Sequence, residues 1–272
     1  MKESKKDNKN LFQKEYVQVM GVLNVTPDSF SDGGKYNTLE AAIKYAKQMI
    51  DNGVDIIDIG GQSTRPGYCE VSISEELQRV LPVIKALRKF APKMPISIDT
   101  YFFEVAKKAV AAGANIINDI HGFRDVRMFE ILQEFPKTHA VIMHGHRKKT
   151  VSLEKEIREF YESKIFQCLK RKISLSRICF DPGVGWKNKE ETMDILRYSD
   201  RYAYPLIPLL IGISRKRIIG SLTKEEEIQN RDLGTIISSL YLANTGYVNI
   251  LRVHDVKGMK QALSVWEQLT KK

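Results

Sequence analysis

Eight short apolar segments recur through the 272 residues of this chain, and each ends in a polar or glycine-rich tip. Most are too short to be helices and are rich in isoleucine and valine, which is typical of strands buried on both faces. Such strands predict a parallel sheet that is covered on both sides. In chain order the segments are residues 17–25, 55–61, 95–100, 115–120, 139–145, 177–183, 206–214 and 249–256.

Amphipathic segments with helical spacing lie between these strands. The first, residues 38–53, carries one apolar stripe and ends at Gly53, which suits a helix C-terminus. In the second, Ser72 and Glu75 predict a capping box, and Pro82 predicts a departure from straight helix geometry. Six further helices are expected at residues 103–112, 125–135, 153–172, 189–198, 230–244 and 257–270.

Strands and helices that alternate in eight units favour a single (β/α)8 TIM barrel of the α/β class. A doubly wound open sheet is the alternative, but the glycine fingerprint G-x-G-x-x-G of that fold is absent. We expect one domain over residues 13–272, preceded by a flexible basic leader over residues 1–12.

Composition narrows the choice of partners and compartment. The formal net charge of +10 suits nucleic acid, an anionic surface or an anionic small substrate, or else a solvated basic surface. The basic run at residues 147–149 has no interleaved aromatic residues, so no nucleic-acid partner is expected. The three cysteines form no C-x-x-C pair, and no stretch reaches the ~20 apolar residues that span a bilayer. These features predict a cytoplasmic protein that does not contact membranes.

Polar residues stand at the carboxyl end of every predicted strand. In a TIM barrel these ends form the mouth where active sites lie. A complete ring of polar tips therefore indicates a ligand site. The tips are Asn24, Gly60–Gly61, Asp99, Asn118–Asp119, Met143–His144, Asp181, Ser214–Arg215–Lys216, and Arg252 with His254–Asp255.

The last two strands predict a site for an anion. Arg252 and His254 are two residues apart and therefore share one face of their strand. Barrels often hold phosphate at strands seven and eight, and an arginine can bind phosphate in a bidentate fork. The alternative is that Arg215 and Arg217 are surface charges and that His254 is a core residue.

The opposite tips predict a site for a flat heterocycle. Asp99 and Asp181 supply acceptors, and the amide of Asn118 both donates and accepts, which suits a ring with N–H donors and nitrogen acceptors. Structural caps are the alternative, and Asp181 could form a turn in the stretch DPGVG. A divalent metal held by protein groups alone fits less well, because no His/Cys cluster accompanies these residues.

Seven motifs together resemble dihydropteroate synthase, a family of pterin-binding barrels. They appear in the order of that family and cover about residues 17–257. The motifs are GVLNVTPDSFSDGG, DIGGQSTRPG, SIDT, IINDI, FDPGVG, LIGISRK and LRVHDV.

The resemblance implies a transferase of folate biosynthesis. Such an enzyme condenses 6-hydroxymethyl-7,8-dihydropterin diphosphate with p-aminobenzoate, and it releases pyrophosphate and 7,8-dihydropteroate. The resemblance also implies Mg²⁺ as cofactor, a homodimer, and sulfonamides as inhibitors. The partners expected are therefore two small-molecule substrates and a second copy of the chain.

The resemblance also assigns residues to each part of the reaction. The pterin would contact Asp99, Asn118, Met143, Asp181 and Lys216. The diphosphate would contact Asn24, Arg65, Arg252 and His254, with Asn24 also on the metal. The p-aminobenzoate would contact Thr64, Pro66, Gly185, Trp186 and Arg217. Catalysis would depend on Asp99, Lys216, Arg252 and His254.

Two loops are expected to close over the substrates. Asn24 would stay at its strand tip while the stretch TPDSFSDGG forms a flap that is hinged at Gly33–Gly34. The loop at residues 61–70 would close opposite this flap.

Three departures from the family pattern concern the p-aminobenzoate pocket. Trp186 is followed directly by Lys187, where relatives usually have Phe-Gly-Lys. The fifth loop, MHGHRKKT, is more basic and compact than usual, and Gln62 stands where glutamate is common. These differences leave the shape of that pocket and the response to sulfonamides open.

Three other functions compete with this interpretation. A methyltetrahydrofolate-binding corrinoid methyltransferase would share the pterin contacts but would have no diphosphate to bind. A non-catalytic basic binding protein would bind DNA in a salt-dependent way and would turn over no substrate. An inactive relative would have lost part of the motif set, which here is intact.

Overall fold

The computed structural model describes residues 11–26, 35–62, 71–145 and 151–270. One eight-stranded parallel sheet follows the order β6-β5-β4-β3-β2-β1-β8-β7. A parallel bridge between Phe180 and Leu209 joins its two edges, so the sheet forms a barrel. The strands are β1 Gln18–Asn24, β2 Ile56–Gly60, β3 Ile96–Asp99, β4 Ile116–Asp119, β5 His139–Met143, β6 Ile178–Asp181, β7 Leu210–Ile211 and β8 Ile250–Val253.

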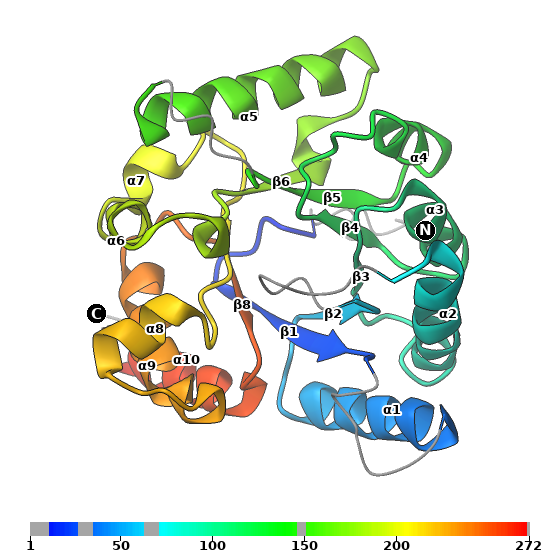
Figure 1. The fold of residues 1–272 in the computed structure, drawn as a ribbon, viewed down its shortest axis with the longest axis horizontal. Helices are drawn as coiled ribbons and strands as arrows, with labels where there is room; N and C mark the ends of the chain where they lie inside the picture. The colour runs from blue at the N-terminus through cyan, green and yellow to red at the C-terminus, as the bar shows by residue number, and fades with distance from the viewer. Residues whose placement is uncertain (1–10, 27–34, 63–70, 146–150, 271–272) are drawn as a thin grey trace, which may run out of the picture.

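Helices surround the strands, and the (β/α)8 barrel predicted from the sequence is confirmed (Figure 1). Each predicted helix is present, and the short helices α7 and α8 were not predicted. The helices are α1 Lys35–Asp51, α2 Ile73–Phe90, α3 Phe103–Ala111, α4 Met128–Glu134, α5 Leu153–Lys170, α6 Lys189–Arg197, α7 Ser199–Tyr202, α8 Arg217–Thr223, α9 Asp232–Asn244 and α10 Val256–Thr270.

Helix α2 differs from its sequence prediction at its start. Ser72 Oγ accepts from the backbone N–H of Glu75 at 3.2 Å, but the Glu75 carboxylate pairs with Arg79. Only this half of the predicted capping box is therefore observed. Pro82 lies inside the helix, which continues unbroken from Ile73 to Phe90.

The lower half of the barrel is filled by apolar side chains at the amino ends of the strands. Phe12 is completely buried there, and its ring meets the edge of the His139 ring at 5.2 Å. Leu11 packs against the same cluster, so Leu11 and Phe12 contact the barrel core, while residues 1–10 of the expected leader lie outside the described residues. The cluster consists of Phe12, Met20, Ile56, Ile116, Val141, Cys179, Leu210 and Ile250.

The register of the strands places the polar tips at one level. Asn24 is aligned with Gly60, Gly60 with Asp99, and Asp99 with Asn118. Side chains two residues apart share a face, so the inward positions of these strands are apolar below and polar above. The fold thus collects the polar residues at the carboxyl mouth.

Candidate active site

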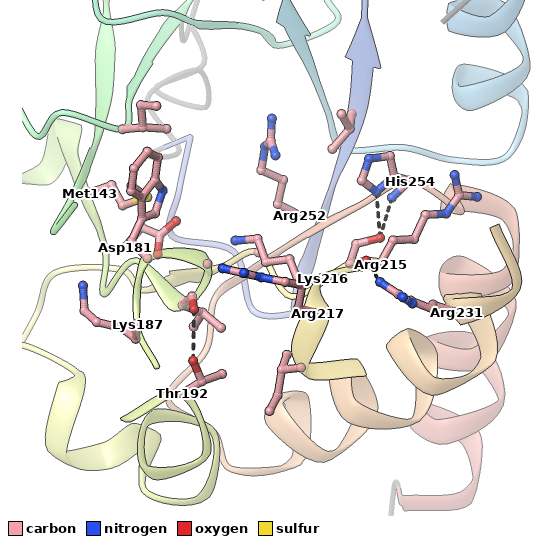
Figure 2. Close-up of a pocket in the computed structure, with 18 of the residues that line it drawn as sticks. Met143, Asp181, Lys187, Thr192, Arg215, Lys216, Arg217, Arg231, Arg252 and His254 are labelled. Atoms are coloured by element: carbon pink, nitrogen blue, oxygen red, sulfur yellow. Dashed lines mark hydrogen bonds between the residues drawn. The ribbon is translucent and has the colours of Figure 1, made fainter. Parts of the chain in front are cut away.

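A cavity of about 680 Å³ opens at the carboxyl mouth of the barrel. Figure 2 shows Arg252, Lys216 and Asp181 directed toward the same space, with Met143 and Lys187 on one side and His254 on the other. Eleven of the residues to which the resemblance assigns a role line this cavity: Asn24, Asp99, Asn118, Met143, Asp181, Gly185, Trp186, Lys216, Arg217, Arg252 and His254. Thr64, Arg65, Pro66 and the flap glycines Gly33 and Gly34 lie outside the described residues.

Arg252 is held by two buried carboxylates. Its Nε donates to Asp58 Oδ2 at 2.7 Å, and its Nη2 donates to Asp99 Oδ2 at 2.6 Å. Burial disfavours the charged guanidinium, but Asp58 and Asp99 outweigh that effect and raise the pKa of Arg252. Within the described part of the chain, Nη1 makes no hydrogen bond to protein, so this nitrogen is available to a ligand.

The acidic side of the cavity has unusual ionisation. Burial raises the pKa of Asp99 to about 7, against the opposing charge of Arg252 and with help from Asp58. Burial also raises the pKa of Asp181, and it lowers the pKa of Lys216 to about 8. The pKa values of Asp99 and Lys216 are thus moved toward each other by burial.

Asp181 and Asp119, at the ends of two strands, also have structural roles. Asp181 Oδ1 accepts from the backbone N–H of Gly183 at 2.7 Å, so the predicted turn in DPGVG exists, although Asp181 also lines the cavity. Asp119 accepts from the backbone N–H groups of His121 and Phe123 at 2.7 and 2.8 Å. Asp119 therefore caps a turn and does not line the cavity.

Glycines make room for the cationic side chains. A Cβ atom at Gly185 would lie 2.8 Å from Lys216 Nζ, and one at Gly212 would lie 3.6 Å from Arg252 Cβ. A Cβ atom at Gly60 would lie 3.5 Å from Asn24 Oδ1. A Cβ atom at Gly185 would therefore displace Lys216, whereas the contacts at Gly212 and Gly60 would be ordinary van der Waals contacts.

His254 is oriented by Ser214, whose Oγ lies 2.9 Å from His254 Nδ1. The same Oγ accepts from the backbone N–H of His254 at 3.1 Å, so the hydroxyl hydrogen can be donated to Nδ1. A neutral ring then carries its proton on Nε2. Tyr45 OH donates to the carbonyl of His254 at 2.9 Å and fixes the backbone.

The cations after β7 behave differently from one another. Arg215 makes a two-pronged pair with Asp232, with Nε–Oδ1 and Nη2–Oδ2 distances of 2.7 and 2.6 Å. Its φ of 59° lies in the left-handed region, which lets the neighbouring residues turn toward the mouth. Arg217 is exposed at the start of α8 and lines the cavity.

The departures from the family pattern have visible consequences. Trp186 is 39% exposed at the rim, and Lys187 Nζ donates to the carbonyl of His144 at 2.9 Å. Gln62 Oε1 accepts from the backbone N–H of Val71 at 2.9 Å, and its Nε2 donates to Tyr101 OH at 2.7 Å. Gln62 thus ties together the two ends of the second loop.

Sequence reasoning missed Asp58 as a part of the site. Asp58 is a carboxylate inside the apolar stretch IIDIG, two residues before Gly60 and therefore on the same inward face. A charge in the middle of a buried strand was the signal that could have identified it. Ser214, named in the sequence as a polar strand tip, and Lys187 both line the cavity.

Comparison with known proteins decides the family. The family model described as "Pterin binding enzyme" matches residues 20–254. The dihydropteroate synthase of Streptococcus pyogenes serotype M6 is 40% identical over 258 residues, which cover 92% of this chain and 95% of that protein. The chain belongs to the dihydropteroate synthase family. It is therefore a transferase of folate biosynthesis that forms 7,8-dihydropteroate.

Solved structures of dihydropteroate synthases have the same fold. The Xanthomonas albilineans enzyme in complex with 7,8-dihydropteroate is 36% identical, has a TM-score of 0.87, and covers 95% of each chain. The Yersinia pestis enzyme in a sulfonamide drug complex is 36% identical, has a TM-score of 0.84, and covers 93% of this chain and 94% of that one. Membership in this family displaces the corrinoid methyltransferase and the non-catalytic binding protein as interpretations.

Among the described residues of this synthase, no helix is long and apolar enough to cross a membrane. The same residues hold no group of three or more His, Cys, Asp and Glu side chains that could bind a metal ion.

Proposed function

We propose that the cavity at the barrel mouth binds the pterin diphosphate along its floor and the p-aminobenzoate at its rim. The observation that carries this proposal is the convergence of Arg252, Asp99 and Lys216 on one space. The substrate carries a charged leaving group and a flat ring, so cationic and acidic side chains must lie within the length of one substrate molecule. The role of each residue is inferred from the family assignment and from the position of its side chain in the cavity.

The half of the cavity that takes the pterin lies between the acidic side chains at the strand ends and the apolar side chain of Met143. Asp99 and Asp181 accept ring and amino N–H groups, and Asn118 adds an oriented amide. Met143 provides an apolar contact for the ring, and Lys216 donates to a ring acceptor. Positive charge that develops on the pterin methylene is thus balanced by buried carboxylates.

The diphosphate half lies against β8. Arg252 Nη1 and the Nε2–H of His254 donate to phosphate oxygens, and Arg65 adds a cation from the second loop. When the C–O bond to the diphosphate breaks, these donors stabilise the negative charge on the departing diphosphate. The p-aminobenzoate nitrogen then forms the C–N bond and loses one proton, and pyrophosphate departs.

The donor set suits Mg²⁺ when the substrate is bound. Magnesium commonly takes one or two protein oxygens and completes its shell with phosphates and water. Asn24 Oδ1 is an amide oxygen at the mouth, and no His/Cys cluster among the described residues competes for a softer metal. A bound magnesium ion would supply charge neutralisation for the diphosphate, and Asn24 is the residue that would hold it.

The p-aminobenzoate half lies at the outer rim. Gly185 and Trp186 provide a flat surface for the aromatic ring, and Arg217 places a cation near the carboxylate. Thr64 and Pro66 are proposed to complete this surface from the second loop. Trp186, followed directly by Lys187, makes this half of the cavity the place where sulfonamide sensitivity is set.

One assay tests the function together with the site. Purified protein, Mg²⁺, the pterin diphosphate and labelled p-aminobenzoate should give dihydropteroate and pyrophosphate in equal amounts. A sulfonamide should compete with p-aminobenzoate and not with the pterin. Folded protein that forms no product from both substrates would overturn the assignment of this cavity.

We also propose a cytoplasmic homodimer that associates through α9. Leu233, Ile237 and Tyr241 are 70%, 60% and 53% exposed and lie four residues apart, so they form one apolar stripe, called here the α9 face. The side of α9 that packs on the barrel instead carries the buried Thr235, Ser239 and Leu242. A helix that exposes an apolar stripe of this kind is suited to a partner helix.

A further inference from the structure

Asp58 is a fully buried carboxylate that lies beneath the cavity and does not line it. Its Oδ2 accepts from Arg252 Nε at 2.7 Å and from Asn118 Nδ2 at 3.1 Å. We propose that Asp58 is a positioning residue that fixes Arg252 and Asn118 together. One carboxylate oxygen thereby sets the direction of the diphosphate contact and the hydrogen-bonding face of the pterin contact.

The contact to Asn118 decides which way its amide points. A carboxylate that is paired with an arginine only accepts hydrogen bonds, so the NH₂ group of Asn118 must face Asp58. The amide oxygen of Asn118 is then turned away from Asp58 and available as an acceptor in the cavity. A ligand that offers an N–H group at this point is favoured over one that offers a lone pair.

The contact to Arg252 decides where its guanidinium points. Nε is tied to Asp58 on β2 while Nη2 is tied to Asp99 on β3, and two such contacts fix the plane of the group. Without Asp58, Nε would lose its acceptor and the guanidinium could turn about the contact with Asp99. The free nitrogen Nη1 would then no longer have a fixed direction.

The energetics also favour a functional role. Among the residues that the structure describes, Asp58 Oδ1 has no hydrogen-bond partner, and neither has the buried Ser97 Oγ on the neighbouring strand. A buried carboxylate with one unsatisfied oxygen is costly, and well-packed apolar residues often replace buried ion pairs without loss of stability. The inward layer directly below is apolar, so the barrel itself does not require a charge at this position.

The inference rests on the proposed roles of Asn118 in pterin binding and of Arg252 in diphosphate binding. The single variants Asn118→Ala and Arg252→Lys test those roles separately. Asn118→Ala should weaken binding of 6-hydroxymethylpterin alone, and Arg252→Lys should weaken binding of pyrophosphate with Mg²⁺. If either variant fails to do so, the role assignment fails, whatever Asp58 does.

Calorimetric titration of Asp58 variants with both half-ligands tests the inference itself. Asp58→Ala should raise the Kd of 6-hydroxymethylpterin and that of pyrophosphate with Mg²⁺ by about 10- to 100-fold each. Asp58→Asn should recover most of both affinities, because its amide oxygen can accept from Arg252 and Asn118. The same variant should move the acid limb of kcat/KM to lower pH, because it removes a charge that raises the pKa of Asp99.

A matched control separates positioning from stability. Asp119 is also a buried carboxylate that accepts two N–H hydrogen bonds, but it caps a turn outside the cavity. Asp119→Asn should lower Tm and leave both Kd values unchanged. If Asp58→Ala does not fold, Asp58→Ser, too short to reach both partners, replaces it. The inference would be overturned if the Asp58 variant bound either half-ligand with a Kd within twofold of wild type. It would also be overturned if Asp119→Asn weakened the binding of both half-ligands as much as the Asp58 variant does.

Discussion

Arg252 is proposed to serve both ends of the substrate, because two of its nitrogens donate to carboxylates and the third is available to a ligand. Arg252→Lys keeps the charge but cannot reach Asp58 and Asp99 together while also donating to phosphate. We expect kcat/KM for the pterin diphosphate to fall about 10²- to 10³-fold, the usual loss for one preorganised donor. Steady-state kinetics at saturating p-aminobenzoate measures this effect.

The control for Arg252→Lys is an arginine of similar burial at a distance from the mouth. Arg177 donates to the carbonyl oxygens of Thr138, Leu132 and Phe135 at 2.7, 2.8 and 3.0 Å. Arg177→Lys should lower Tm and preserve kcat/KM. Equal kinetics in the two variants would argue against a special role for Arg252.

The ionisation of Asp99 should appear in the pH profile. Its pKa is raised to about 7, chiefly by burial, so the carboxyl is increasingly protonated in the free enzyme as the pH falls below 7. Protonated Asp99 is a poorer acceptor for Arg252 and for the pterin. We expect kcat/KM to decrease on the acid side of about pH 7 and this limb to disappear in Asp99→Asn. An unchanged limb in Asp99→Asn would assign it to another group.

At the scale of elements, α2 carries a buried acid beside the second strand. Glu76 Oε2 has no hydrogen-bond partner in the described part of the chain, and burial raises the pKa of Glu76 to about 7. Since the folded pKa lies above the unfolded one, folding takes up a proton, and this contribution to stability is lost as the pH rises from about 4.5 through 7.

Glu76→Gln should therefore stabilise the protein at alkaline pH. The expected gain in the free energy of unfolding is about 2–3 kcal/mol at pH 8 and close to zero at pH 4. Urea unfolding at the two pH values measures it, and the exposed Glu75→Gln provides the matched control. A gain that is the same at both pH values would show that the carboxyl does not titrate as argued.

The elements differ in how well the sequence predicted them. Long apolar runs with polar tips gave every strand, because burial on both faces leaves a continuous apolar signature. The seventh was predicted over residues 206–214, yet β7 covers only Leu210–Ile211, since Pro208 has no N–H to donate and the chain turns at Ser214–Arg215 before α8. The short helices α7 and α8 lack the length that makes helical periodicity visible.

The site was predictable where a polar tip stood alone at a strand end, as with Asp99 and Arg252. It was not predictable where function depends on a contact between distant strands. Asp58 meets Arg252 across 194 positions of sequence, and only the closed barrel brings the two together. Which nitrogen of Arg252 is available and which way the Asn118 amide faces follow from that contact.

At the scale of the whole molecule, packing and chemistry occupy opposite ends of the barrel. Phe12 and the apolar layer close the amino end, while the charged layer with Asp58 and Arg252 forms the carboxyl end. In this fold the barrel core usually provides stability, and the loops at the carboxyl ends of the strands carry the active site. Association through α9 would add a partner on the outer surface of the barrel, away from the strand ends.

The α9 face gives the last prediction. Ile237→Glu places a charge in the centre of the apolar stripe, where a partner helix would have to bury it, and burying an unpaired charge is strongly unfavourable. We expect light scattering to report a dimer for the wild type and a monomer for Ile237→Glu at micromolar concentration. Leu206→Glu is the matched control, because Leu206 is 93% exposed before β7 and should leave the dimer intact. Since every cavity residue named above comes from one chain, the monomer should retain pterin binding. A wild-type monomer, or an Ile237→Glu dimer, would place the interface elsewhere or remove it.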